Sequence, residues 1–576
     1  MDMKQQLAQS VLHMMNQEFC YALEEDYIKI KLRVGKSLCS KVRLAFVDKY
    51  KYLHQRATIE EMDMELVAQD EAFDYYEGII ENQKRLVINY YFILETKQGE
   101  FYYGADRLME QAPFDIRFMY FLSGNVLRSQ RFSPISWATE GIVYQIFPDR
   151  FDCGEGGTQK GDWSRKPSPM DHFGGNINGI TKHLDYLQEL GVTILYLTPI
   201  FESTSNHKYN TKDYMKLDPS FGTMEDVKNF VQQAHEKGMK VIFDGVFNHS
   251  GDDFAPFCDV VKKGEASEYK DWFQIHSFPL ETDWRKEPNY GSFSYFAGMP
   301  QLNPDSKELR DYVKQVIDYW MQETDIDGWR LDVADEVTHG FWKEFRKWVK
   351  ANKKDAIIIG EVWYDSREWL KGDEFDTVMN YDFYYAVKDF LVLKEIDAKE
   401  FINQLERLRG MYHKSAYEML WNLIDSHDCA RFLTDVGENK NILKQAVLLQ
   451  MTMTGTPMIY YGDEVGMIGG PDPDCRRGMV WEDEKQDKEL LEFYKKIIQI
   501  RKAHPSLVKG ELLSKTEEKS NVLIFEKKWK EEKMLVVINA SKESYTNSEI
   551  TGKVDMLTGK RIEQVEANGM CLIQKS

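Results

Sequence analysis

The sequence has few cysteines and no long apolar run, and each absence excludes a class of protein. Its seven cysteines lie far apart and form no Cys-x-x-Cys pair, which argues for reduced thiols and against a disulfide framework or a zinc site. No apolar stretch approaches the roughly 20 residues of a membrane-spanning helix. The first residues lack the apolar core of a secretory signal, so we expect a cytoplasmic protein that does not bind membranes.

Acidic residues outnumber basic ones. The 576 residues carry a net charge of −20, without a basic tail or a cluster of Lys and Arg. Nucleic acids and anionic membranes both require basic surface, so we expect neither as a partner. Aromatic residues make up 13% of the chain, and their flat rings can stack on sugars, although most aromatic residues serve as core.

Several catalytic motifs are missing. The sequence contains no His-Glu-x-x-His metal motif, no GxxxxGK[ST] phosphate loop and no Gly-x-Ser-x-Gly nucleophile elbow. The glycine-rich stretch FGGNING (173–179) follows no strand directly and lacks GxGxxG spacing, so we interpret it as a turn. These absences argue against metalloprotease, nucleotide-binding and serine-hydrolase chemistry.

The two ends of the chain have the pattern of β-domains. Residues 1–132 contain short stretches in which polar and apolar residues alternate, at 27–34, 41–48, 85–94 and 100–105. This pattern predicts an N-terminal β-sandwich domain. The helical pattern stops near residue 506, and NVLIFEKKW (521–529) and KMLVVINA (533–540) predict a C-terminal β-sandwich domain over 506–576.

Strands and helices alternate in the middle of the chain, residues 133–505. Eight apolar stretches predict strands, at 141–149, 193–200, 240–250, 328–333, 356–363, 376–382, 418–428 and 456–464. Amphipathic helices lie between several of them, including one over 176–191 and one that Thr223 and Asp226 would cap. The fold class is therefore α/β, a (β/α)8 TIM barrel, with a doubly wound open sheet as the alternative. Residues from about 250 to 304 would form a small domain inserted after the third strand.

Polar residues follow the predicted barrel strands where each strand ends. They are Asp244, Asn248 and His249 on the third, Arg330 and Asp332 on the fourth, Glu361 on the fifth, and Asp425, Ser426, His427 and Asp428 on the seventh. Each one alone has an ordinary explanation as a solvated acid, a helix cap or a core histidine. The carboxyl ends of barrel strands surround one axis, however, so together they predict an active site.

The stretch DGWRLDVADEV (327–337) places two opposite charges in an apolar strand. Arg330 and Asp332 are two residues apart and should point to the same side, because side chains alternate along a strand. Burying them is unfavourable unless they are paired. Carboxylates that face each other across a sugar hydrolyse glycosidic bonds, and an arginine would keep one of them ionised.

These residues carry a resemblance to a known family. DGVFNHS (244–250), GWRLDVADE (328–336), GEVW (360–363) and LIDSHD (423–428) resemble, in order and spacing, the four signature regions of the α-amylase family of glycoside hydrolases. MPQLN (299–303), SNHKYNTKDY (205–214) and GGPDPDCRRGMVW (469–481) are similar to the group of neopullulanases, cyclomaltodextrinases and maltogenic amylases. The resemblance covers nearly the whole chain and is weakest at residues 1–130 and 510–576.

The resemblance implies a role for each site residue. Asp332 would be the nucleophile, Glu361 the general acid/base and Asp428 the third catalytic carboxylate, while Arg330 would orient the nucleophile. The implied substrate-binding residues are Tyr209, Asp244, Asn248, His249, Trp363, His427, Asp472 and Arg476. The implied reaction is retaining hydrolysis of α-1,4-glucosidic bonds in cyclodextrins, maltooligosaccharides and, in addition, pullulan or starch, with some transglycosylation.

Four positions depart from the residues common in the group. They are Asn210, Gln301, Asp335 and Tyr364, in place of Asp, Lys, Asn and His, and they leave the preferred substrate open. The loop after residue 148 lacks the acidic composition of the family's calcium site, with Asn176 where Asp is common. We therefore expect no required metal or other cofactor. The resemblance also implies a homodimer formed through the N-terminal domain.

Three alternatives differ in how well they fit. A glucanotransferase or branching enzyme would use the same residues, so it stays open. An oligo-1,6-glucosidase is disfavoured by MPQLN, because those enzymes carry QPDLN at this place. A binding protein without activity is disfavoured because all three carboxylates are present.

Overall fold

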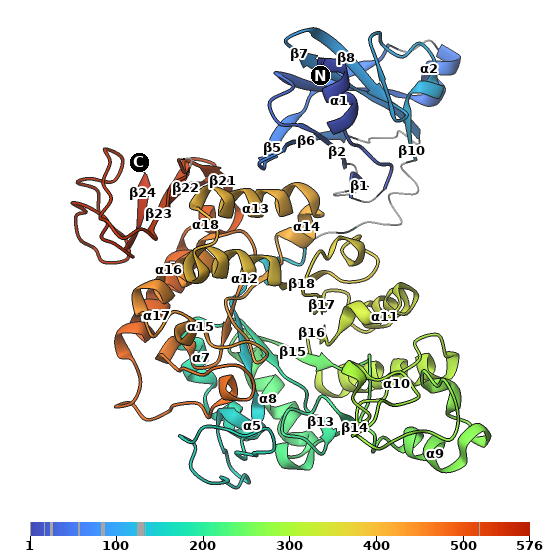
Figure 1. Ribbon diagram of the computed structural model, residues 1–576, viewed down its shortest axis with the longest axis vertical. Coiled ribbons are helices and arrows are strands. Elements are labelled where there is room, and N and C mark those ends of the chain that lie inside the picture. Colours follow the sequence, from blue (N-terminus) through green and yellow to red (C-terminus); the bar gives the residue numbers. More distant parts are fainter. Residues whose placement is uncertain are drawn as a thin grey trace. The chain divides into compact units, whose positions relative to one another are not determined.

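The computed structural model describes residues 2–16, 18–22, 27–55, 58–81, 87–123, 132, 134–517 and 519–575. The chain forms two compact units (Figure 1). The first consists of Met1–Pro134, Arg367–Asp373 and Ile396–Tyr417, and the second of Ile135–Ser366, Glu374–Glu395 and Glu418–Ser576.

The first unit contains two antiparallel sheets. One has the order β1 (Cys20–Ala22), β2 (Tyr27–Gly35), β6 (Phe73–Glu81), β5 (Glu65–Gln69). The other has the order β4 (Glu60–Asp63), β3 (Lys41–Asp48), β7 (Val87–Thr96), β8 (Gly99–Gly104), β9 (Arg107–Met109), and β10 (Tyr120–Ser123) also pairs with β7. Ile30, Leu44 and Phe92 belong to one buried core, which confirms the N-terminal β-sandwich. Residues 85 and 86 of the predicted strand over 85–94 lie outside the described residues.

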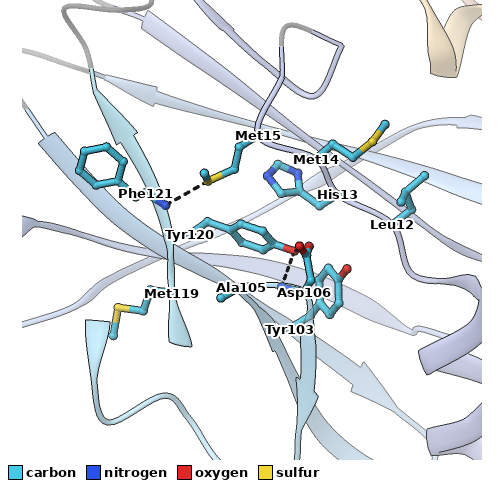
Figure 2. A pocket seen from close by; sticks show the side chains of 10 residues that line it. All are labelled: Leu12, His13, Met14, Met15, Tyr103, Ala105, Asp106, Met119, Tyr120 and Phe121. Atoms are coloured by element: carbon cyan, nitrogen blue, oxygen red, sulfur yellow. Dashed lines mark hydrogen bonds between the residues drawn. The ribbon is translucent and has the colours of Figure 1, made fainter. Parts of the chain in front are cut away.

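The first unit also contains helices, and those within residues 1–132 were not evident from the alternating pattern there. They are α1 (Met3–Ser10), α2 (Lys49–Gln55), η1 (Ile116–Phe118), η7 (Arg367–Trp369), α13 (Ala398–Met411) and α14 (Lys414–Tyr417). A cavity of about 570 Å³ also lies in this unit (Figure 2). The Tyr120 hydroxyl donates to Asp106 at 2.7 Å and the Phe121 N–H to the sulfur of Met15 at 3.4 Å. No residue that lines this cavity is among the predicted site residues.

The second unit contains a closed barrel of eight parallel strands. Their order is β11 (Val143–Ile146), β12 (Ile194–Leu197), β15 (Lys240–Gly245), β16 (Gly328–Leu331), β17 (Ile357–Gly360), β18 (Thr377–Asn380), β19 (Trp421–Asn422), β20 (Thr456–Tyr460). Strand β11 pairs with both β12 and β20, so the sheet closes. This confirms the TIM barrel and rules out the open sheet. The strands are shorter than predicted; Tyr381, for example, already begins a helix.

The helices of the second unit cover the barrel strands and fill the connections. They are α4 (Ser136–Thr139), α5 (Pro148–Phe151), α6 (Ile177–Lys182), α7 (Leu184–Leu190), α8 (Met224–Glu236), α10 (Lys307–Thr324), α11 (His339–Asn352), α12 (Tyr381–Val387), η8 (Lys388–Leu393), α15 (Phe432–Asp435), α16 (Lys440–Thr452), α17 (Lys488–Ala503) and α18 (Pro505–Lys509). Helices α10 and α11, which precede β16 and β17 in the chain, lie side by side (Figure 1). Short 3-10 turns are η2 (Pro219–Phe221), η6 (Ala334–Glu336), η9 (Asp463–Val465) and η10 (Asp474–Arg476).

Two helix predictions have different outcomes. Thr223 and Asp226 form the expected capping box at the start of α8. The single helix predicted over 176–191 is wrong, because it breaks at His183 into α6 and α7. The ring of His183 hydrogen-bonds to Asp152 at 2.7 Å and stacks on Trp481 with centroids 3.4 Å apart. These distant partners hold the ring in place and are invisible to local periodicity.

The segment between β15 and α10 is largely irregular. It contains α9 (Ala255–Lys263), η3 (Gly264–Ala266), η4 (Lys270–Trp272), η5 (Phe293–Tyr295) and isolated bridges such as His249 with Gln301. A short hairpin of β13 (Phe201–Ser203) and β14 (Thr211–Leu217) precedes α8. The domain limits 133–505 and about 250–304 stay predictions.

The C-terminal part is antiparallel, as expected. Strands β21 (Glu511–Ser514), β22 (Val522–Trp529), β23 (Glu532–Asn539) and β24 (Met570–Lys575) form one sheet in this order. Ile524, Val537 and Ile573 lie in its core. The limits 1–132 and 506–576 stay predictions. In the part of the chain that the structure describes, no helix has the length and apolar character needed to cross a membrane.

Candidate active site

Arg330 lies at the centre of the polar residues that follow the barrel strands. Its Nη1 donates to both carboxylate oxygens of Asp244, at 3.1 and 3.0 Å, and to Oδ1 of Asp332 at 2.8 Å. Its Nη2 forms an ion pair with Oε1 of Glu361 at 2.9 Å. One guanidinium group therefore joins carboxylates from the ends of β15, β16 and β17.

The carboxylate of Glu361 is held from two further directions. The backbone N–H of Val333 donates to Oε2 at 3.0 Å, and the indole N–H of Trp363 donates to Oε1 at 3.2 Å. Val333 has φ 46° and ψ 47°, a left-handed conformation that is strained for a β-branched residue. This conformation directs the N–H of Val333 toward Glu361. The strained residue therefore helps to position a candidate catalytic carboxylate.

Burial controls the charge of this cluster. Asp244, Arg330, Asp332 and Glu361 are all buried. Burial and then repulsion from Glu361 raise the pKa of Asp332, while Arg330 opposes the shift. Burial also raises the pKa of Asp244 to about 6, again against the effect of Arg330. For Asp244 and Asp332, burial therefore favours the protonated carboxyl, and Arg330 favours the ionised one.

His427 is fixed through both ring nitrogens. Its Nδ1 lies 2.7 Å from Nε2 of Gln145, and its Nε2 lies 2.5 Å from the hydroxyl of Tyr209 and 3.2 Å from Oδ2 of Asp428. The Tyr209 hydroxyl in turn donates to Asp244 at 3.0 Å. Burial lowers the pKa of His427 well below its usual value, so the ring is neutral and acts as a hydrogen-bonding group.

Asn248 and His249 lie together on the loop after β15. Burial lowers the pKa of His249 to about 4, and its Nε2 has no hydrogen-bond partner within the described residues. A buried ring nitrogen without a partner is suited to bind a substrate hydroxyl. Asn248 donates to Glu336 at 3.2 Å and accepts from Gln301 at 3.2 Å, so it bonds these two side chains rather than the catalytic candidates.

The other predicted site residues also join the cluster. Arg476 pairs with Asp428 at 3.1 Å and with Asp472 at 2.9 Å, which places these three side chains together. Its Nε also donates to the carbonyl oxygen of His427 at 2.8 Å. Trp363 stacks on Tyr381, with ring centroids 3.9 Å apart and planes at 16°.

Sequence reasoning missed several neighbours of the site. Gln145 contacts His427, the hydroxyl of Tyr196 donates to Asp244 at 2.6 Å, and Phe293 stacks on His249 with centroids 4.9 Å apart. Gln145 had a usable signal, because it is the one amide in the apolar strand VYQIF. Nothing in the sequence marked the aromatic residues, including Tyr381, as neighbours of the site, because aromatic rings in or near strands usually belong to the core.

The loop near Asn176 does not fit a calcium ion. Oδ1 of Asn176 accepts from the N–H groups of Gly154 and Gly179 at 3.1 and 2.8 Å, and Nδ2 donates to the carbonyl oxygen of Glu155 at 3.4 Å. The amide thus presents a donor where a cation would need an acceptor. Across the described residues, no group of three or more His, Cys, Asp or Glu could hold a metal ion. The absence of a required cofactor stays a prediction.

Comparison with known proteins identifies the family. The family model described as "Alpha amylase, catalytic domain" matches residues 145–510, and that described as "Alpha amylase, N-terminal ig-like domain" matches residues 6–123. The chain belongs to the α-amylase family. It is a glycoside hydrolase, as its signature motifs predicted.

Relatives of this α-amylase family member match nearly its whole length. A cyclomaltodextrinase of Geobacillus thermopakistaniensis (strain MAS1) is 41% identical over 98% of this chain and 97% of its own. Neopullulanase 2 of Thermoactinomyces vulgaris is 40% identical over 96% of each chain. A solved structure of a cyclomaltodextrinase has a TM-score of 0.90 at 37% identity and covers 98% of both chains. The resemblance to this group is confirmed.

Proposed function

We propose that this α-glucan hydrolase cleaves α-1,4-glucosidic bonds of cyclodextrins and short maltooligosaccharides, and also of pullulan or starch, with retention of configuration. The observation that carries the proposal is the contact of one guanidinium, that of Arg330, with both Asp332 and Glu361. The names of its relatives, cyclomaltodextrinase and neopullulanase, support this class of substrate.

The first step forms a covalent intermediate. The ionised carboxylate of Asp332 attacks the anomeric carbon as the glycosidic bond breaks, and Glu361 gives its proton to the departing oxygen. Arg330 favours the ionised form of Asp332 and directs its carboxylate, because it donates the hydrogen bond to Oδ1. Val333 and Trp363 hold the Glu361 carboxyl beside the departing oxygen.

The second step releases the product. Glu361, now ionised, takes a proton from a water molecule whose oxygen attacks the anomeric carbon, and the bond to Asp332 breaks. Two inversions leave the α-configuration unchanged. If a sugar hydroxyl attacks instead of water, the same residues make a new glycosidic bond, which is the transglycosylation alternative.

The remaining residues would bind the sugar ring. Asp428, His427 and His249 would bind hydroxyls of the sugar that Asp332 attacks, and Tyr209 would stack on it. Their support is the contact of His427 with both Tyr209 and Asp428, together with Nε2 of His249, which has no hydrogen-bond partner among the described residues. Asp472 and Arg476, which pair with each other, would bind the next sugar along the chain.

The test is a comparison of initial rates on cyclodextrin, pullulan and soluble starch, with identification of the products. Maltose from cyclodextrin supports the cyclomaltodextrinase activity, and panose from pullulan supports the neopullulanase activity. A preference for starch over both would contradict the proposed substrate. Products longer than the substrate, formed as the main outcome at high substrate concentration, would favour the glucanotransferase alternative.

We also propose that the protein is cytoplasmic, requires no metal and forms a homodimer through its N-terminal domain. Activity that survives dialysis against a chelator would support the second point. Sedimentation of the chain with and without residues 1–130 tests the third, because loss of that domain should yield monomers. Fractionation of the source cells tests the first.

A further inference from the structure

Two of the positions where this chain departs from its group contact each other. The hydroxyl of Tyr364 donates a hydrogen bond to the carboxylate of Asp335. Asp335 lies in η6, which follows β16, and Tyr364 lies in the loop that follows β17. The contact therefore links the loops that carry the proposed nucleophile and the proposed proton donor.

The pair lies beside the proton donor. Asp335 comes three residues after Asp332, and Tyr364 comes three residues after Glu361. Between them, the Val333 N–H donates to Oε2 of Glu361 at 3.0 Å and the Ala334 N–H donates to its carbonyl oxygen at 3.2 Å. Hydrogen bonds thus join the loop after β16 to the loop after β17, both at Glu361 and at the contact between Asp335 and Tyr364. Glu361 is the proposed proton donor to the departing oxygen, so the side chains that follow it in these two loops would face the leaving sugar.

Tyr364 has a ring that is free to bind. It exposes 60% of its surface, although the residues that hold the catalytic carboxylates are buried. Its neighbour Trp363 offers less free ring, because one face is covered by Tyr381. The hydrogen bond to Asp335 also raises the pKa of Tyr364 to about 12, so the hydroxyl stays protonated and keeps donating across the working pH range.

We propose that Tyr364 is a stacking platform for the sugar on the leaving-group side of the cleaved bond, and that Asp335 is the positioning residue that fixes its ring. The proposal rests on the proposed function and assigns part of its specificity. Aromatic rings bind the apolar faces of sugars, and a ring already held by a hydrogen bond loses less freedom when the sugar binds.

The experiment compares a substrate that has a leaving sugar with one that has none. Maltotetraose places sugar units beyond the cleaved bond, whereas α-maltosyl fluoride releases only fluoride. For Tyr364→Ala, kcat/KM on maltotetraose should fall about five- to tenfold, the scale of one aromatic contact. On α-maltosyl fluoride it should change less than twofold. Tyr364→Phe and Asp335→Asn keep the ring but loosen it, so their loss on maltotetraose should be smaller than that of Tyr364→Ala.

A second readout tests the same surface from the acceptor side. With α-maltosyl fluoride as donor, the concentration of maltose needed for half-maximal transfer should rise in Tyr364→Ala by a similar factor. Trp529→Ala is the matched control, because it removes a ring on β22 that is 38% exposed. It should leave kcat/KM unchanged on both maltotetraose and α-maltosyl fluoride.

The outcomes separate this assignment from the proposed function. An equal loss on both substrates would overturn the platform, since it would mean that Tyr364 acts through Glu361 or the fold. Unchanged kinetics on maltotetraose would overturn it as well. A wild-type enzyme inactive on both substrates would instead refute the proposed function, and the platform with it.

Discussion

Arg330 and Asp332 lie on the same side of the barrel wall, and Nη1 of Arg330 donates a hydrogen bond to Oδ1 of Asp332 at 2.8 Å. The alternation of side chains along β16, continued by one residue beyond its end at Leu331, gives this shared side. Because Arg330 also bonds Asp244, neither charge is buried without a partner. The arrangement gives direct expectations for substitutions in the cluster.

Asp332→Asn should abolish the first step. The amide has nearly the same shape as the carboxylate but cannot attack the anomeric carbon. We expect kcat on cyclodextrin to fall by roughly four orders of magnitude or more, with circular dichroism and melting temperature nearly unchanged. A loss of only a few-fold would place the nucleophile elsewhere.

Arg330→Lys should lower kcat by about a hundredfold. Lysine keeps the positive charge, but one ammonium group cannot reach Asp244, Asp332 and Glu361 as the planar guanidinium does. Arg501→Lys is the matched control, because Arg501 is also buried but, among the described residues, its hydrogen bonds go to the backbone oxygens of Met451, Gly455 and Leu507. It should lower the melting temperature and leave kcat per folded molecule within a few-fold. Equal kcat losses in both variants would argue against a special role for Arg330.

Tyr209→Phe should weaken substrate binding and turnover together. The hydroxyl that it removes lies between Asp244 and His427, so both partners lose a hydrogen bond in a buried site. We expect kcat/KM on maltotetraose to fall about tenfold or more. Tyr214→Phe, which removes a buried hydroxyl bonded to the carbonyl oxygen of His249, serves as control and should cost less activity.

The stereochemistry of the first product follows from the two-step mechanism. Proton NMR recorded within the first minutes of maltotetraose hydrolysis should show the α-anomer before mutarotation. If the β-anomer appears first, the reaction inverts the anomeric carbon and Asp332 is not a covalent nucleophile.

Asp327 should contribute to stability at neutral pH and lose this contribution in acid. Burial alone would raise its pKa, but hydrogen bonds from His235, Lys353 and the Val241 N–H outweigh burial and hold its pKa well below the usual range. A group whose folded pKa is depressed stabilises fully above its unfolded pKa of about 3.9, and the contribution falls as the pH drops toward the folded pKa.

We therefore expect Asp327→Asn to melt several degrees below wild type at pH 7, with a gap that narrows below about pH 4. Thermal unfolding followed by fluorescence at a series of pH values measures this. Asp325→Asn is the control, because the Asp325 side chain is 72% exposed and should matter little. A gap between wild type and Asp327→Asn that is constant with pH would contradict the assignment.

Residue patterns alone predicted the order of the barrel strands, the capping box of α8 and the shared side of Arg330 and Asp332. These features depend on periodicity and on residues at most a few positions apart, so a local stretch of sequence is enough to predict them. The signature segments also predicted that Asp332 and Glu361 directly follow β16 and β17, because the end of a strand can be recognised from its own residues.

The contacts between the loops at those strand ends could be found only in the folded chain. Gln145 meets His427, which is 282 residues away, and the Asp335–Tyr364 hydrogen bond joins two loops that the sequence could only mark as unusual. The break of the predicted helix at His183 and the left-handed turn at Val333 belong here as well. In each case a side chain or a backbone N–H contacts a partner that is brought near when the barrel closes. The favourable energy of that contact outweighs the conformation that the local sequence prefers.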